Sequence, residues 1–180
     1  YAPSTTRPLS IVNTDNRLIA NAYRLMMEPI ISKWVSDMQR GFLNGRSMLS
    51  NVVDVDHEAM IISLKHPNGA IVLFDFASAF PSISQEYMWK VLSHIGLPEG
   101  ILQAIQRLYV NNLHYVKVKG GHFPSFTATS GVRQGCPLSP LLFAIVADVL
   151  LRRLNSNLPA CLVRAFADDT AIVIPNFHTY

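Results

Sequence analysis

Two adjacent aspartates, Asp168 and Asp169, interrupt an apolar, β-branched stretch at residues 164–175. The segments on either side favour strands, so the two acids are expected at the turn of a hairpin. Aspartate is common in turns, where a solvated carboxylate needs no chemical role. No glycine follows the pair, and two carboxylates at a hairpin tip can also hold a hard divalent cation, which takes oxygen ligands. The pair alone leaves both interpretations open, and a third carboxylate nearby would favour the cation site.

A third carboxylate, Asp75, stands near the end of the apolar run AIVLFDF at residues 70–76. A continuous run of this length predicts a buried central strand. A lone acid there costs free energy unless it is paired, hydrogen-bonded or bound to a metal. If this strand lies beside the terminal hairpin, Asp75 can face Asp168, and a divalent cation would neutralise their repulsion. Two such ions about 3.5–4 Å apart can stabilise both the attacking and the leaving oxygen of a phosphoryl transfer.

The elements that must position these acids are predicted from periodicity and turn residues. Helical spacing of apolar residues, with a capping-box pair at Ser82 and Gln85, predicts helices over residues 16–28, 50–64, 84–94, 101–109 and 141–155. Pro29 is expected to end the first helix or to restart it. Loops are expected at 39–48 and 130–140, a turn at 66–69, and β-hairpins at the C-terminal end and at 114–129, the latter turning at Gly120 and Gly121. This order predicts an α+β fold with helices packed on an antiparallel sheet.

Composition narrows the class of protein without deciding its chemistry. The chain has 180 residues, which suits one domain, or one domain and part of another. Hydrophobic residues make up 49% of the chain and charged residues only 15%, which argues against disorder. The formal net charge of +3 is compatible with a nucleic-acid partner and is too small to argue for one.

Cysteine and hydropathy patterns exclude further classes. Cys136 and Cys161 form no CxxC pair and no zinc-binding set, which indicates reduced thiols in an intracellular protein. The longest apolar run, residues 141–151, is too short to span a bilayer and contains Asp148. No secretory signal is visible. The chain begins without Met and stops just past the paired aspartates, so it is expected to be an excerpt of a longer protein.

Five ordered motifs resemble those of reverse transcriptases. FDFASAF (74–80), SGVRQGCPLSPLLF (130–143) and FADD (166–169) have the order and approximate spacing of motifs A, B and C of that family. RPLSIVNTD (7–15) and QRGFLNGRSMLSN (39–51) resemble the finger motifs of non-LTR (LINE-type) retrotransposon and group II intron enzymes. Each motif alone is weakly specific, but five in order over essentially the whole chain are hard to obtain by chance.

The resemblance implies the fingers and palm of a right-hand polymerase, with an antiparallel palm sheet packed on helices. The fingers would occupy residues 1–68. The palm would occupy residues 69–180, with an inserted helix–hairpin segment, and would be truncated after motif C, with the thumb absent. The implied activity is that of an RNA-directed DNA polymerase, a nucleotidyltransferase that adds deoxynucleotides to a primer 3′-OH. An isolated fragment of such an enzyme can be inactive.

Carried over residue by residue, the resemblance implies a catalytic set of Asp75, Asp168 and Asp169. Asp75 and Asp168 would hold two Mg²⁺ ions, or Mn²⁺ in their place, and Asp169 would be the third acid of the metal site. Phe76 would contribute mainly its backbone to the triphosphate–metal assembly, and core packing explains its side chain equally well.

The resemblance also implies a nucleotide-binding set: Arg7, Phe76, Ala79, Phe80, Gln134 and Gly135. The ring of Phe80 would lie under the incoming sugar, leaving no room for a ribose 2′-OH, although core packing is its ordinary alternative. Gln134 would contact the nucleotide, and Gly135 would let the backbone approach it closely. The Arg7 guanidinium would grip the triphosphate, whose geometry it fits.

Four basic residues are candidates for nucleic-acid contacts: Arg46, Arg133, Lys117 and Lys119. Arg46 would contact template or nucleotide phosphates. Arg133 would contact template phosphate, or be a solvated loop residue. Lys117 and Lys119 alternate with valines, so both are expected on one side of the hairpin, where they would follow a nucleic-acid backbone or form a solvated strand face.

The chain departs from the family pattern at a few positions. The finger lysine upstream of Arg7 is absent, Ala144 stands where many relatives carry Asn, and Pro81 follows Phe80 where Asp is common. None of these changes removes a metal ligand, and no endonuclease motif is visible.

Two rival functions stay open: an inactive, domesticated scaffold that binds RNA or protein, and a metal-dependent nuclease that uses the same acids. The polymerase would bind an RNA template, a DNA primer and deoxynucleoside triphosphates, with no membrane. It would act inside the cell, and in the nucleus if its element is eukaryotic.

Overall fold

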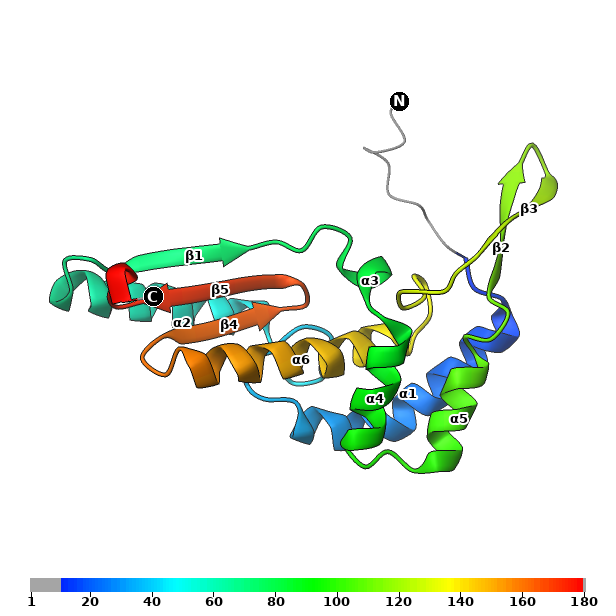
Figure 1. Cartoon of the computed structure of the whole chain (residues 1–180), viewed down its shortest axis with the longest axis horizontal. Coiled ribbons are helices and arrows are strands. Elements are labelled where there is room, and N and C mark those ends of the chain that lie inside the picture. The colour runs from blue at the N-terminus through cyan, green and yellow to red at the C-terminus, as the bar shows by residue number, and fades with distance from the viewer. Residues whose placement is uncertain (1–10, 180) are drawn as a thin grey trace. The chain divides into compact units, whose positions relative to one another are not determined.

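The computed structural model describes residues 11–179 (Figure 1). The chain divides into two compact units. Of the described residues, one unit, named the sheet unit, comprises 23–79 and 140–179. The other, named the hairpin unit, comprises 11–22 and 80–139. Both contain helices and antiparallel strands, so the predicted α+β class is confirmed.

The sheet unit contains a three-stranded antiparallel sheet in the order β1-β5-β4 (Figure 1). β1 is Ala70–Phe74, β4 is Leu162–Phe166 and β5 is Asp169–Ile174, followed by the short 3-10 helix η2 (Phe177–Thr179). β4 and β5 form the predicted terminal hairpin. β1 pairs with β5, so the expectation that the strand before Asp75 lies beside this hairpin is confirmed.

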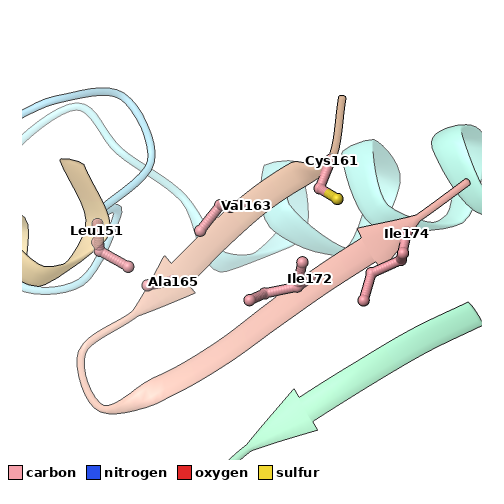
Figure 2. Close-up of a cluster of buried hydrophobic side chains, with 6 residues drawn as sticks. All are labelled: Leu151, Cys161, Val163, Ala165, Ile172 and Ile174. Atoms are coloured by element: carbon pink, nitrogen blue, oxygen red, sulfur yellow. The ribbon is translucent and has the colours of Figure 1, made fainter. Parts of the chain in front are cut away.

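Helices cover both faces of this sheet. Helix α6 (Ser139–Asn157) adds Leu151 to a buried cluster with residues of the terminal hairpin, which Figure 2 shows: Leu151, Cys161, Val163, Ala165, Ile172 and Ile174. Because side chains alternate along a strand, Arg164 points to the opposite face, where it bonds to Asp54 of helix α2 (Met48–Lys65). Each buried Leu, Ile or Val contributes about 1.5–3 kcal/mol to stability relative to an exposed position.

The expectation that the strand at residues 70–76 is buried and central is wrong. β1 lies at the edge of the sheet, and its Ile71, Leu73 and Phe74 side chains are exposed among the described residues. The central strand is β5, in which four of six residues are buried. A continuous apolar run indicates a strand but not how many neighbours it has, and the pairing decides that.

The expectation that Pro29 interrupts the first helix is also wrong. Helix α1 runs from Thr14 to Trp34 and passes through Pro29. Proline removes one main-chain hydrogen bond from a helix. Pro29 is exposed, as is Leu25 four residues before it, so the carbonyl that loses its partner is not sealed inside the core.

The acid in the apolar helix α6 is buried and paired. Asp148 accepts hydrogen bonds from Arg152 Nε (2.7 Å) and from the main-chain N–H of Ser36 (3.1 Å), whose hydroxyl donates to it as well. These bonds offset the cost of removing the carboxylate from water. Among the described residues, no helix is long and apolar enough to cross a membrane.

The hairpin unit combines two short helices with a two-stranded hairpin. It contains the single turn α3 (Ala79–Ser82, its first residue assigned to the sheet unit), α4 (Gln85–His94) and α5 (Glu99–Arg107). The hairpin strands are β2 (Leu113–Val118) and β3 (Gly121–Thr127). The turn is Lys119–Gly120, one residue earlier than predicted, and both residues have positive φ (47° and 84°), as a two-residue hairpin turn of type I′ requires.

The N-terminus of α4 is capped two residues later than the sequence suggests. Ser84, not Ser82, is the N-cap residue, and its hydroxyl accepts a hydrogen bond from the Tyr87 N–H (3.3 Å). The side-chain amide of Gln85 donates to the carbonyl of Gly131 (3.2 Å). The capping-box pattern predicted a local hydrogen bond for the Gln85 side chain, but this side chain bonds to a residue 46 positions away.

Candidate active site

The two adjacent aspartates lie at the tip of the β4–β5 hairpin, as predicted. Phe166 pairs with Asp169, so the loop between the strands consists of Ala167 and Asp168 alone. Ala167 has a φ of 59°, a left-handed conformation that costs free energy for any residue with a Cβ. Asp168 is half-buried and Asp169 is exposed. The tip is therefore a strained turn that carries two carboxylates.

Asp75 lies at the same end of the sheet. It follows Phe74, the last residue of β1, which pairs with Thr170 of β5. One step further in this antiparallel register, the residue opposite Asp75 is Asp169. Because neighbouring strands lie about 4.8 Å apart, the sheet brings the main chains at all three acids together. Asp75 is exposed, so its charge does not carry the burial cost expected for a central strand.

The three acids do not form a closed ligand cluster. Among residues 11–179, no three His, Cys, Asp or Glu side chains form a group that could hold a metal ion. The donor set still fits a hard divalent cation, because each donor is a carboxylate oxygen on an accessible or partly accessible side chain. The metal assignment stays a proposal.

A buried glutamine contacts the hairpin tip from a distant part of the chain. Gln39 Oε1 accepts hydrogen bonds from the N–H groups of Ala167 (2.9 Å) and Gly41 (2.8 Å). Gln39 Nε2 donates to the carbonyl oxygen of Ala167 (3.0 Å). The N–H and the carbonyl of Ala167 are thus both bonded to the side chain of Gln39, which is 0% exposed.

An ion-pair network joins the segment next to Gln39 to helix α2 and strand β4. Asp54 of α2 accepts hydrogen bonds from Arg164 Nε and Arg40 Nη2, both at 2.7 Å. The bond from Arg164 is the largest cause that lowers the pKa of Asp54, and Arg40 adds to it, so that together they outweigh the opposing effect of burial. Asp54 therefore links the segment after α1 to β4.

Arg46 bonds to four main-chain carbonyls of its own chain. Its Nη1 donates to the carbonyls of Ser36 and Gln39 (2.6 Å for Gln39), and its Nη2 donates to those of Ser32 and Val35 (2.7 Å each). The side chain is 14% exposed. Both terminal nitrogens of Arg46 thus bond to the chain itself, and the contact of Arg46 with template or nucleotide phosphates stays a prediction.

The loop at residues 130–135 packs against the segment that follows Phe80. The N–H of Val132 donates to the carbonyl of Phe80 (3.0 Å), and the N–H of Gly131 donates to that of Ile83 (2.7 Å). A Cβ on Gly131 would lie 2.7 Å from Pro81 Cα, and the φ of Gly131 is +78°. Only glycine fits this close approach, which holds the two predicted nucleotide segments together.

Arg133 and Gln134 line a cavity of about 310 Å³ in the hairpin unit, together with His114 and Phe126, whose rings are stacked 4.8 Å apart. The guanidinium of Arg133 lies over the ring of Tyr109, 5.3 Å from its centroid. Burial lowers the pKa of Arg133, and burial raises the pKa of Tyr109 to about 12. At neutral pH a cationic Arg133 therefore lies over an uncharged ring beside the cavity.

Three further predicted residues lie in the described part of the chain. Gly135 is exposed with a φ of 77°. Phe76 is exposed and Ala79 is buried. Arg7 lies outside the described residues.

Lys117 and Lys119 are exposed, but only Lys117 lies on a strand face, opposite His122. Lys119 lies in the turn, so the expectation that both lysines share one face is wrong.

Sequence reasoning missed Gln39, the Arg40–Asp54–Arg164 network and the bonds of Arg46. All belong to or touch the motif at residues 39–51, so the motif marked the region but not its partners. Gln39 and Ala167 are 128 positions apart, and no local pattern connects them.

Three comparisons with known proteins bear on this geometry. A family model described as "Reverse transcriptase (RNA-dependent DNA polymerase)" matches residues 2–179. The chain is 30% identical over 177 residues to the "Retrovirus-related Pol polyprotein from type-2 retrotransposable element R2DM" of Drosophila melanogaster, covering 94% of this chain and 16% of that protein. It is 31% identical over 133 residues to the Pol polyprotein of a type-1 retrotransposable element R2 from Popillia japonica, covering 69% of this chain and 22% of the relative. The chain thus spans less than a quarter of either relative.

A solved telomerase structure from Candida albicans matches the fold. The TM-score is 0.63 at 13% identity, covering 92% of this chain and 31% of the telomerase. At this identity the likeness concerns the fold alone.

Proposed function

Because the chain belongs to the reverse transcriptase (RNA-dependent DNA polymerase) family, we propose that it forms the fingers, residues 1–68, and the palm, residues 69–180, of an RNA-directed DNA polymerase. The resemblance to non-LTR retrotransposon enzymes is confirmed by its retrotransposon relatives. The substrates would be an RNA template, a DNA primer and deoxynucleoside triphosphates. The location would be the nucleus if the element is eukaryotic.

The observation that carries this proposal is the strand register at the end of the sheet. It sets Asp75 beside the tip that bears Asp168 and Asp169. In the proposed reaction the primer 3′-hydroxyl loses its proton to water and its oxygen forms a bond to the α-phosphorus of the nucleotide. The bond from that phosphorus to the oxygen that bridges to the β-phosphorus breaks, and pyrophosphate leaves. Asp75 and Asp168 would hold two Mg²⁺ ions, or Mn²⁺, with Asp169 as the third acid. When bound, such ions stabilise negative charge on the attacking and leaving oxygens.

The other residues that the resemblance singles out would contact the nucleotide and the template. Phe80 would lie under the sugar, with Phe76, Ala79, Gln134 and Gly135 around the nucleotide and Arg7 on its triphosphate. Support for this set is the bond from the Val132 N–H to the Phe80 carbonyl, which joins its two segments. Arg133 would face template phosphate, and Lys117 and Lys119 would lie along the nucleic-acid backbone.

Primer extension by the full-length protein tests the proposal. Asp75→Asn keeps the size of the side chain but removes its charge, so we expect extension on an RNA template to fall below detection. Asp56→Asn, at an exposed position on α2, is the matched control and should keep wild-type activity. Synthesis by the Asp75→Asn protein at near wild-type rate would refute the polymerase assignment. If the protein is an inactive scaffold, neither wild type nor either variant will extend the primer. If it is a nuclease, wild type will degrade the primer instead of extending it.

A further inference from the structure

We propose that Gln39 is a positioning residue for the catalytic tip: its buried amide holds Ala167 and thereby sets the direction of Asp168 and Asp169. This inference rests on the proposed polymerase function, since it assigns Gln39 a role in that reaction without contact with a substrate. It concerns the sheet unit alone, to which all of these residues belong.

The first support is the completeness of the bonding at Ala167. Its N–H donates to Gln39 Oε1 and its carbonyl accepts from Gln39 Nε2, at 2.9 and 3.0 Å. Ala167 is 8% exposed, so water is poorly placed to replace either bond. The same Oε1 also accepts from Gly41 N–H at 2.8 Å, which fixes the orientation of the amide itself.

The second support is the conformation of the residue that is held. Ala167 has a φ of 59°, which an alanine adopts only where its surroundings favour it. In a two-residue loop the ladder of the hairpin stops at Phe166 and Asp169, so Ala167 relies on bonds from outside the hairpin. The Gln39 amide supplies them, and it thereby opposes relaxation of the turn that carries Asp168.

The third support is the main chain around Gln39. Residues on either side of it bracket Ala165: the N–H of Ala165 donates to the Met38 carbonyl (2.7 Å), and the N–H of Arg40 donates to the Ala165 carbonyl (2.8 Å). Beyond this bridge a Cβ on Gly41 would lie 2.1 Å from Ala167 N, so the chain runs directly against the tip. The main chain on either side of Gln39 is therefore bonded to β4, which keeps the Gln39 side chain next to Ala167.

The functional consequence follows from the geometric tolerance of catalysis. Catalytic groups must be held within about 0.5 Å of their productive positions. A displacement of about 1 Å can lower a rate by about 100-fold. Loosening the tip should thus lower kcat, whereas substrate contacts made by other residues should leave KM for the nucleotide nearly unchanged.

Two variants of the full-length protein test the effect. Gln39→Met keeps the length of the side chain and removes all three bonds. Gln39→Glu keeps the two acceptor bonds but sets a buried carboxylate oxygen against the Ala167 carbonyl in place of the donor. The matched control is Gln106→Met on α5, a half-buried glutamine in the hairpin unit.

Two readouts are measured: amide hydrogen exchange of residues 166–169 without metal or substrate, and kcat and KM for the nucleotide in primer extension. We expect exchange at the tip to rise at least tenfold in Gln39→Met and to rise in Gln39→Glu as well, with kcat falling in both and KM within twofold of wild type. Gln106→Met should change neither readout.

The inference is overturned if a folded Gln39→Met protein keeps wild-type exchange at the tip, or if its loss of activity appears in KM alone. If Gln39→Met does not fold, Gln39→Glu decides by the same two measurements, and unchanged exchange there is equally decisive. If both variants unfold, Gln39 serves stability and the positioning role is rejected. If wild type itself extends no primer, the proposed function and the role in catalysis fail together, while the exchange data still report whether Gln39 holds the tip.

Discussion

Replacing Arg46 by alanine should destabilise the protein strongly without a specific effect on nucleotide binding. The guanidinium donates four hydrogen bonds to carbonyls between residues 32 and 39. Two of these belong to residues that are 2% exposed or less, Val35 and Gln39, so water cannot readily replace the lost donor. A buried acceptor left unpaired costs about 1–3 kcal/mol. Two such acceptors predict a loss of about 3 kcal/mol in the free energy of unfolding.

Urea and thermal unfolding measure this loss. For a chain of this length, about 3 kcal/mol corresponds to a fall in Tm of about 6–12 °C. Arg46→Lys should fall in between, because an ammonium cannot donate to four carbonyls with the planar fork of a guanidinium. Arg153→Ala, at an exposed position on α6, is the control and should change stability by less than about 0.5 kcal/mol. If Arg46→Ala unfolds like wild type but binds nucleotide or template more weakly, the structural role is wrong and the phosphate contact is right.

Two further predictions follow from other contacts. The pKa of Asp54 lies below its usual value of 3.8, so the stabilising effect of its charge is present above pH 3.8 and is lost as the pH falls through the folded-state pKa. Wild type should therefore lose stability in acid more steeply than Asp54→Asn. Parallel acid-unfolding curves for the two proteins would contradict the network. Phe80→Val should raise incorporation of ribonucleotides relative to deoxynucleotides in primer extension if the ring excludes the 2′-OH, with Phe177→Val, at an exposed position in η2, as the control. An unchanged ratio of the two nucleotides would assign Phe80 to packing.

Local patterns were enough to find most elements of this chain. The apolar spacing that predicts helices over residues 50–64 and 101–109 depends on neighbours three and four positions away, and α2 and α5 lie there within a few residues. The terminal hairpin was predictable because both strands and their two-residue loop are adjacent in sequence. The motifs likewise identified the family, because the order and spacing of motifs are properties of the sequence.

What the sequence could not decide depends on contacts between distant residues. The run at residues 70–74 is as apolar as a central strand, but pairing with β5 alone leaves it at the edge. Gln85 has the spacing of a capping residue and bonds to the carbonyl of Gly131. The sequence likewise gave no sign that Arg46 bonds to four carbonyls of its own chain. A side chain chooses among such partners by which of them the fold brings within about 3 Å, and sequence spacing carries no record of that.

The sequence by itself therefore determined the kinds of residue at the candidate site, three carboxylates near strand ends, and the family to which the chain belongs. The tertiary structure decided that Asp75, one step beyond the pairing of β1 with β5, stands opposite Asp169, and that Gln39 bonds to Ala167 in the turn between β4 and β5. The physical reason is that register and buried hydrogen bonds are settled only when segments about 100 residues apart pack together, because only then must each buried polar group find its partner.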